Sequence, residues 1–297
     1  MDFFVAWYMR DPQYPQFDED CGMLVSVASV PQRWRISDLK TLPTRVIVDS
    51  GGFRHSQVGG TLPTPRALFA RQLHMIEGLP PQCEITLCAL DLPILDPLAT
   101  ANDRDRLLYQ TLANAYEFKR LTDNKKNGQS YKTLAIVQGF DLASFRRSAY
   151  ELRAIGFDSY GVGSLAFLGS IQELQRRIEV VQDVVGSAIH VFGVTRGRQI
   201  SLLKQLGVAS IDSSTPIKAG MFNQLFYSDP FRRFVLATHR HNTEAKNPNR
   251  LHKPLPCPCP VCHGTINMNL MLTGSKTYNH LRAIHNYFHL KRHITSN

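Results

Sequence analysis

The stretch RVIVDSGG, residues 45–52, decides the fold. Its branched apolar residues precede an aspartate and two glycines, a pattern typical of a short buried strand that enters a functional loop. Similar runs follow at residues 84–91 (EITLCALD), 133–139 (TLAIVQG), 158–164 (DSYGVGS), 189–194 (IHVFGV) and 208–212 (VASID). Two earlier runs, FFVAWYM at 3–9 and GMLVSVASV at 22–30, would bring the number of strands near eight.

Segments with helical spacing lie between these runs, at residues 103–121, 142–155 and 171–185. In the second segment, one helix face carries the apolar residues Leu142, Phe145, Ala149, Leu152 and Ile155. Alternation of strands and helices predicts an α/β fold with a parallel sheet. A total near eight strands favours a TIM-type (β/α)8 barrel over an open doubly wound sheet, for which no glycine-rich phosphate loop is present.

A barrel of this type places its functional residues at the carboxyl ends of the strands. Polar residues occupy that position in five of the predicted strands, namely Asp49, Asp91, Gln138, Ser164 and Asp212. We therefore expect these five side chains to converge on one pocket.

The pattern changes after about residue 216. A mixed segment leads into a polar, proline-rich stretch, and helical character returns from Thr277, with Leu281, Ile284 and Phe288 on one face. We predict a barrel over residues 1–216 and a separate basic subdomain with a closing helix over residues 217–297.

The amino-acid composition indicates the class of the protein and the compartment in which it folds. The hydrophobic fraction of 43% is ordinary for a globular protein, and no apolar run reaches the length of a membrane span. The first residues, MDFFVAWYMRDP, have an acid at Asp2 and no basic region before the apolar run, so they do not read as a secretory signal. The six cysteines do not form a disulfide pattern, which predicts a reducing compartment such as the cytoplasm, and the lack of a long apolar run predicts no membrane contact.

The formal net charge of +10 favours a polyanionic partner. Basic residues are dense between Arg232 and Lys253, where Glu244 is the one acid, although a solvated basic loop would look the same. The residues that we expect to contact nucleic-acid phosphates are Lys218, Arg232, Arg233, Arg240, Lys246 and Arg250.

The stretch PLPCPCPVCHG, residues 254–264, places three thiols in six positions, at Cys257, Cys259 and Cys262. Structural zinc takes four ligands, so one more must come from elsewhere in the chain. His263 directly follows Cys262 and reaches back poorly, which leaves the histidines of the tail helix, His280, His285, His289 and His293. A catalytic metal, as in a barrel hydrolase, would instead need ligands among the strand ends.

Together these motifs resemble the tRNA-guanine transglycosylases, which exchange guanine for a 7-deazaguanine in a polynucleotide. The resemblance covers about residue 46 to the C-terminus and rests on DSGGF at 49–53, on the strand-end motifs in their expected order, and on the cysteine spacing. It implies that AIHNYF carries the fourth zinc ligand as His285, with His289 as the fallback, and that the zinc is structural.

The resemblance also implies roles for the pocket residues. Asp212 would be the nucleophile that forms a covalent sugar–enzyme intermediate, a role that suits a carboxylate ionised at neutral pH, and Asp49 would be the general acid/base. The residues implied to bind the base are Asp91, Gln138, Ser164, Leu165, Phe53, Phe192 and Gly193. Of these, Asp91 and Gln138 would read the polar edge, backbone amides near Ser164 and Leu165 would meet the base carbonyl, and Phe53 and Phe192 would sandwich the ring. Plain core packing is the alternative for Phe192.

Two departures from the family pattern bear on the substrates. Enzymes that take the aminomethyl base resemble GGLAVGE where this chain reads GSLAFLG, so Gly169 stands in place of a glutamate and the uncharged nitrile preQ0 is the better incoming base. The stretch STPIKAG after Asp212 offers only Lys218, and the large RNA-binding domains of the archaeal branch are lacking, which favours DNA over tRNA.

Three alternatives stay open at this level. The substrate could be tRNA, a homodimer or accessory proteins could take part, and the chain could be a non-catalytic, nucleic-acid-binding partner of the same fold. Retention of both Asp49 and Asp212 disfavours the last of these.

Overall fold

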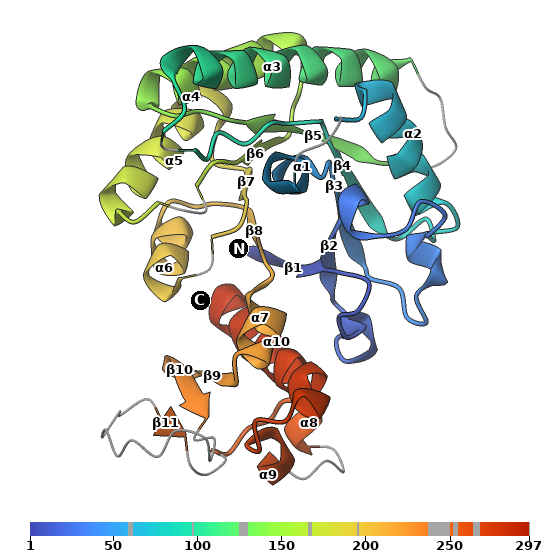
Figure 1. Cartoon of the computed structure of the whole chain (residues 1–297), viewed down its shortest axis with the longest axis vertical. Helices are drawn as coiled ribbons and strands as arrows, with labels where there is room; N and C mark the ends of the chain where they lie inside the picture. Colours follow the sequence, from blue (N-terminus) through green and yellow to red (C-terminus); the bar gives the residue numbers. More distant parts are fainter. Residues whose placement is uncertain are drawn as a thin grey trace.

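Eight parallel strands close into a barrel in chain order, as the computed structural model shows (Figure 1). The strands are β1 (Asp2–Trp7), β2 (Gly22–Ser26), β3 (Arg45–Asp49), β4 (Glu84–Cys88), β5 (Lys132–Val137), β6 (Tyr160–Val162), β7 (Ile189–Val191) and β8 (Ser210–Ser213). Strand β8 pairs with β1, with Asp212 opposite Phe4, which closes the ring. All eight apolar runs of the sequence contribute a strand, so the predicted TIM-type barrel is confirmed and the open sheet is wrong.

The structure describes residues 1–58, 62–96, 98–124, 130–165, 168–194, 196–236, 250–251, 255–263 and 268–296. Helices α2 (Pro65–Ile76), α3 (Ala101–Asp123), α4 (Leu142–Ile155), α5 (Ile171–Val185) and α6 (Gly197–Gln205) connect successive strands from β3 to β8. The expected spans of α4 and α5 match residue for residue. Helix α3 begins earlier than expected because the Thr100 hydroxyl accepts a hydrogen bond from the Asp103 amide and so caps the helix. No helix in the described residues is long and apolar enough to cross a bilayer.

Short 3-10 turns replace full helices after the first two strands, at η1 (Tyr14–Gln16), η2 (Val27–Ser29) and η3 (Ile36–Asp38). A small helix, α1 (Gly52–Val58), follows β3 directly and lies in front of the barrel strands in Figure 1.

Side chains alternate between the two faces of each strand, as the pleat requires. The buried inward-facing apolar cluster consists of Phe4, Ala6, Leu24, Ile47, Cys88, Leu134 and Ile136, with Phe192 packed against it. The outward faces of the strands join a larger core shared with the surrounding helices. The barrel interior is therefore packed, and its polar residues stand out at the carboxyl ends of the strands.

A second lobe follows the barrel and lies below it in Figure 1. Helix α7 (Thr215–Met221) leads into a three-stranded sheet in the order β11-β10-β9, formed by β9 (Gln224–Ser228), β10 (Phe231–Leu236) and β11 (Arg250–Leu251). The short helices α8 (Pro260–His263) and α9 (Met268–Met271) and the turn η4 (Lys276–Tyr278) come next. This sheet has its own small core, which includes Leu225, Phe234 and Leu251.

The last helix, α10 (Asn279–Thr295), returns to the barrel. The Tyr287 ring lies 5.9 Å from Phe3 and 4.9 Å from Tyr14, and Lys291 Nζ lies 2.7 Å from an Asp18 oxygen. Because α10 packs against both the barrel and the second lobe, it is buried over more than one face. The expected stripe is present: Ile284 is buried, and the half-buried Leu281 and Phe288 pack in the same cluster against the cysteine segment. The division at residues 216 and 217 stays a prediction.

Candidate active site and metal centre

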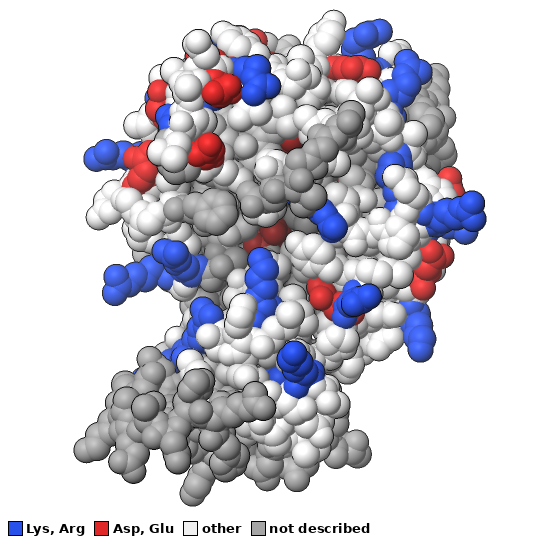
Figure 2. All heavy atoms as spheres, in the orientation of Figure 1, with Lys and Arg blue, Asp and Glu red and all other residues white. Residues whose placement is uncertain are grey.

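The carboxyl ends of the barrel strands carry three aspartates in electrostatic contact. Asp49 is the last residue of β3, Asp91 follows β4, and Asp212 lies within β8. The charge of Asp212 raises the pKa of Asp49, and the charge of Asp49 raises the pKa of Asp91. In the space-filling view, acidic side chains lie in a hollow in the middle of this face, and Lys and Arg side chains stand around it (Figure 2).

Asp49 is held by the turn that follows its strand. The Gly51 amide donates a hydrogen bond to Asp49 Oδ2 at 3.0 Å, and the Ser26 hydroxyl at the end of β2 donates another. Burial raises the pKa of Asp49, and the neighbouring Asp212 charge raises it further, against the opposing effect of these hydrogen bonds. Such a carboxyl can hold a proton closer to neutral pH than an exposed aspartate does.

Asp91 accepts two side-chain hydrogen bonds, one on each oxygen. The Ser50 hydroxyl donates to Oδ1 at 2.7 Å, and the Gln138 amide donates to Oδ2 at 2.6 Å. Burial, with a further contribution from the Asp49 charge, raises the pKa of Asp91 to about 6. Gly52 permits this arrangement, because a Cβ atom there would lie 2.2 Å from the Asp91 carbonyl oxygen.

Gln138 is fixed in turn by the loop after β6. The Ser164 hydroxyl donates to Gln138 Oε1 at 2.5 Å and accepts from the Ile94 amide at 2.9 Å. Ser164 adopts a φ of 56°, a left-handed conformation that costs a non-glycine residue energy and often marks a functional site. The next residue, Leu165, is buried. Asp91, Gln138 and Ser164 therefore form one connected hydrogen-bond network.

Asp212 is nearly buried, with 7% of its surface exposed. The Gly193 amide donates to Asp212 Oδ1 at 2.9 Å. His190 Nε2 lies 3.4 Å from the same oxygen, and the histidine is itself buried inside the barrel. The sequence did not predict this contact, since Gly193 was expected to bind the base and here its amide holds Asp212.

The two phenylalanines lie in different surroundings. Phe192 is half-buried and packs on the inner cluster of the barrel, with its ring 4.4 Å from His190 in an edge-on contact. Phe53 lies on α1 with 49% of its surface exposed. Phe192 therefore takes part in core packing, which the sequence left as an alternative to base stacking, and Phe53 is accessible at the rim.

Sequence reasoning missed three polar residues of this site, Ser26, Ser50 and His190. Ser50 lay inside the DSGGF motif, and its position between Asp49 and Gly51 was the available signal. His190 precedes Phe192 by two positions, so the strand period of two placed both on the same face of β7. Ser26 became visible only through the pairing of β2 with β3, where it stands opposite Asp49.

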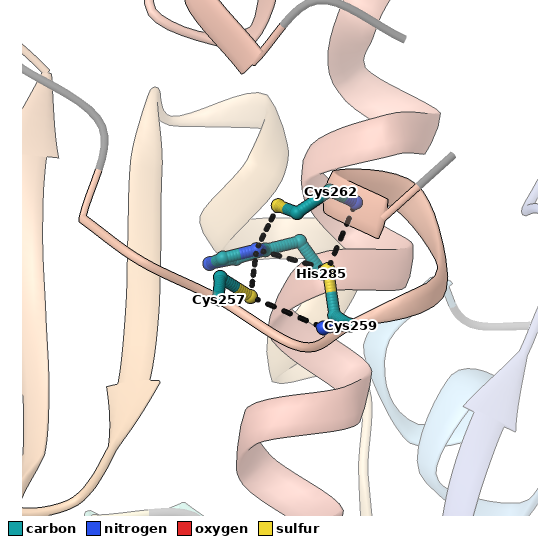
Figure 3. Close-up of side chains that lie close together, drawn as sticks. All are labelled: Cys257, Cys259, Cys262 and His285. Atoms are coloured by element: carbon teal, nitrogen blue, oxygen red, sulfur yellow. Dashed lines mark hydrogen bonds between the residues drawn. The ribbon is translucent and has the colours of Figure 1, made fainter. Parts of the chain in front are cut away.

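The cysteine cluster assembles with one tail histidine (Figure 3). One ligand atom from each of Cys257, Cys259, Cys262 and His285 lies within 4.8 Å of the others. His285 Nδ1 is 3.6 Å from Cys257 Sγ and 3.4 Å from each of the other two sulfurs, and His285 Nε2 is 2.8 Å from the Phe226 carbonyl oxygen. Because Nε2 must donate to that carbonyl, Nδ1 keeps its lone pair for a metal. Three thiols and one imidazole fit the tetrahedral zinc site of structural modules, so this cluster could hold zinc.

His289 lies beside the cluster in a different role. Its Nε2 is 3.0 Å from Cys257 Sγ, while its Nδ1 is 3.1 Å from the Ser228 hydroxyl. Only one of the three thiols is therefore near His289, whereas all three surround His285. This geometry favours His285 as the fourth ligand.

Three of the six predicted nucleic-acid residues can be placed with their side chains. Lys218 on α7 and Arg232 and Arg233 on β10 are all exposed, and Arg233 Nε donates to Gln224 Oε1 at 2.8 Å. Arg240 and Lys246 lie outside the described residues. Arg250 begins β11, but its side chain is not among those described.

Comparison with known proteins gave two matches. A family model described as queuine tRNA-ribosyltransferase matches residues 84–296, which include the Asp91, Gln138 and Asp212 motifs and the cysteine cluster. A DNA-guanine transglycosylase from Salmonella montevideo is 27% identical over 96 residues, which make up 32% of this chain and 23% of that protein. The matched part thus spans less than a quarter of the length of this relative.

Proposed function

Because the chain belongs to the queuine tRNA-ribosyltransferase family, we propose that it is a guanine transglycosylase that exchanges a guanine of a nucleic acid for a 7-deazaguanine. The observation that carries this proposal is the pair Asp49 and Asp212 at the carboxyl end of the barrel, with the pKa of Asp49 raised. One carboxylate can attack while the other holds a proton. A non-catalytic partner of the same fold would need neither.

The exchange proceeds through two displacements at the sugar. A carboxylate oxygen of Asp212 forms a bond to the anomeric carbon while the bond from that carbon to guanine breaks. The electron pair goes to the departing base, which takes a proton from Asp49. Asp49, now ionised, accepts a proton from the incoming base, whose nitrogen attacks the anomeric carbon and releases Asp212.

The Asp91, Gln138 and Ser164 network is proposed to read the base. Asp91 can accept from the N1–H and exocyclic amine of guanine, and Gln138 can donate or accept. Backbone amides near Ser164 and Leu165 are proposed to meet the base carbonyl, with Phe53 against the ring. The hydrogen bonds among these three side chains, at 2.5 and 2.6 Å, support this role, because they fix the orientation of each group before a base arrives.

Zinc, held by Cys257, Cys259, Cys262 and His285, is proposed to be structural. The ligands come from the segment at α8 and from α10, and none comes from a barrel strand end. Bound there, the metal supplies a cross-link between residues 257 and 285 of the chain. We propose that residues 1–216 form the catalytic barrel and that residues 217–297 form the zinc-binding subdomain.

DNA is the proposed polynucleotide, and preQ0 is the proposed incoming base. The name of the Salmonella relative, a DNA-guanine transglycosylase, supports the first choice. The second rests on Gly169, which offers no acid to a substrate ammonium and has no atom of the described residues within 4 Å of the place that a Cβ would take. A guanine in duplex DNA would have to leave the base stack, at a cost of a few kcal/mol that contacts from Lys218, Arg232 and Arg233 would offset. The unpaired cysteines suit the reducing, cytoplasmic compartment expected for such an enzyme.

The test is incubation of the purified protein with radiolabelled guanine and either bulk tRNA or duplex DNA, followed by a chase with preQ0. We expect label to enter DNA and to be displaced by preQ0. Label that enters tRNA alone would refute the DNA preference and leave the transglycosylase, whereas no label in either polymer would refute the activity.

A further inference from the structure

A buried histidine lies beneath the proposed nucleophile. His190, on β7, is 3% exposed and makes edge-on contacts with the rings of Phe192 at 4.4 Å and Phe4 at 5.9 Å. Its Nε2 lies 3.4 Å from Asp212 Oδ1 and makes no hydrogen bond with any described residue. A buried polar atom without a partner is costly, so its direction toward Asp212 calls for an explanation.

The other ring nitrogen of His190 determines which nitrogen carries the proton. Strand pairing sets His190 opposite Ser210, and the Ser210 hydroxyl lies 2.8 Å from His190 Nδ1. If the hydroxyl donates to Nδ1, the proton of a neutral imidazole is on Nε2 and points at the carboxylate. The opposite tautomer would turn a lone pair toward Asp212 and would be repelled by its charge. Electrostatics therefore favours the Nε2–H form, and the Ser210 hydroxyl can supply the matching donor to Nδ1.

The carboxylate of Asp212 is consequently asymmetric. The Gly193 amide and His190 Nε2 both face Oδ1, while the described residues offer no donor to Oδ2. The Gly193 hydrogen bond holds Oδ1, and a donor from His190 to the same oxygen would fix the rotation of the carboxylate and leave the other oxygen for bond formation. Catalytic hydrogen bonds are often long or poorly aligned in a free enzyme and tighten when substrate binds, so the 3.4 Å separation does not rule out a donor role for His190.

The geometry points to His190 as the positioning residue of Asp212, with Ser210 as the residue that sets its tautomer. This inference rests on the proposed transglycosylase function. In the first displacement Oδ2 forms the bond to the anomeric carbon, the bond to guanine breaks, and the electron pair leaves with the base. His190 keeps its proton throughout and acts by holding Oδ1.

Two substitutions separate the donor from the volume of the side chain. His190→Phe keeps a ring between Phe4 and Phe192 but deletes the N–H, whereas His190→Gln keeps a donor of similar reach. His74→Phe, on the outer helix α2, is the matched control. The readouts are kcat, the KM for the incoming base, and the rate at which a labelled guanine-containing oligonucleotide forms a covalent adduct that survives denaturation.

We expect His190→Phe to lower kcat and the adduct rate by about 10- to 100-fold with KM for the base unchanged, the size expected for loss of one donor to a charged group. His190→Gln should retain activity within about 5-fold, and His74→Phe should match wild type. Equal activity of His190→Phe and wild type would overturn the inference, as would equal losses in His190→Phe and His190→Gln. A wild-type protein without exchange on DNA or tRNA would instead overturn the proposed function, and the role of His190 with it.

A second measurement does not need the His190→Phe variant. Long-range nitrogen–proton NMR correlations of histidine-labelled protein distinguish the two neutral tautomers, and the His190 signals are those absent from His190→Gln. We expect a proton on Nε2. A signal pattern of the Nδ1–H tautomer would overturn the inference even if His190→Phe fails to fold.

Discussion

The barrel mouth and the cysteine cluster both gather polar side chains from distant parts of the chain, but they hold them differently. At the mouth, Asp91 and Asp212 accept hydrogen bonds at 2.6–2.9 Å from protein groups on neighbouring strands and loops. At the cluster, three sulfurs and one imidazole nitrogen face one another within 4.8 Å. The mouth is organised by protein donors, whereas the cluster is arranged around a point where an ion fits.

Because of this difference, we expect the mouth to determine turnover and the cluster to determine the stability of the second lobe. The apolar strands of the barrel fold around their own core, so a polar residue at the mouth can be changed with small effect on the fold. The second lobe has a small core, and structural zinc contributes roughly 10–16 kcal/mol of apparent binding energy in modules of this kind. Substitutions at the mouth should therefore affect turnover, and substitutions at the cluster should affect folding.

Asp212→Ala should have the largest effect on activity and tests the role of the barrel mouth. Without the nucleophile no covalent intermediate forms, and we expect guanine exchange to fall by roughly 10³-fold or more. Metal content and melting temperature should stay close to those of the wild-type protein, as measured by mass spectrometry of the metal and by calorimetry. Substantial exchange by this variant would show that Asp212 is not the nucleophile.

Cys259→Ser tests the other region. Cys259 is fully buried among the ligands, so its loss should release the metal and lower the melting temperature of the whole protein, because α10 packs on the barrel as well. Cys83→Ser, a buried thiol outside the cluster, is the matched control and should keep one zinc per chain. Zinc retained by Cys259→Ser at that ratio would contradict the site.

The two neighbouring histidines sharpen the same test. His285→Ala should lose the metal, since its Nδ1 faces all three sulfurs. His289→Ala should retain it, because only Cys257 Sγ is near its ring. The reverse pattern in metal content would assign the fourth ligand to His289.

The sequence predicted the barrel well because buried parallel strands have a recognisable sequence pattern, a short apolar run that ends in a polar residue. Spacing alone singled out the three cysteines that gather in the cluster. It could not choose among the tail histidines without a resemblance, since the choice depends on a hydrogen bond between His285 and the Phe226 carbonyl, 59 residues apart. His190 was missed for a similar reason: its contacts with Ser210 and Asp212 follow from strand register, which the pattern does not specify.

Asp91→Asn should change how stability depends on pH. The pKa of Asp91 is raised to about 6, above the value near 3.9 expected in the unfolded chain. Between these values the folded protein holds a proton that the unfolded chain has lost, so stability falls as pH rises through this window, by on the order of 3 kcal/mol. An amide side chain does not ionise in this window, so the variant does not lose stability there. The free energy of unfolding of the variant, measured with urea, should therefore rise relative to that of wild type by about this amount between pH 4 and pH 7.5. If the difference between the two proteins is the same at both pH values, the raised pKa is contradicted.

Arg232→Ala should have the smallest effect and tests whether the second lobe contributes to substrate binding as well as to stability. If Arg232 contacts one phosphate of duplex DNA, its removal should reduce the slope of log affinity against log salt by about 0.9, because one counterion fewer is released. Lys132→Ala is the matched control, since Lys132 begins β5 at the opposite, amino end of the barrel strands. Binding titrations at several salt concentrations give both slopes. Equal slopes for the two variants would remove Arg232 from the proposed interface and leave the second lobe with a structural role at that position.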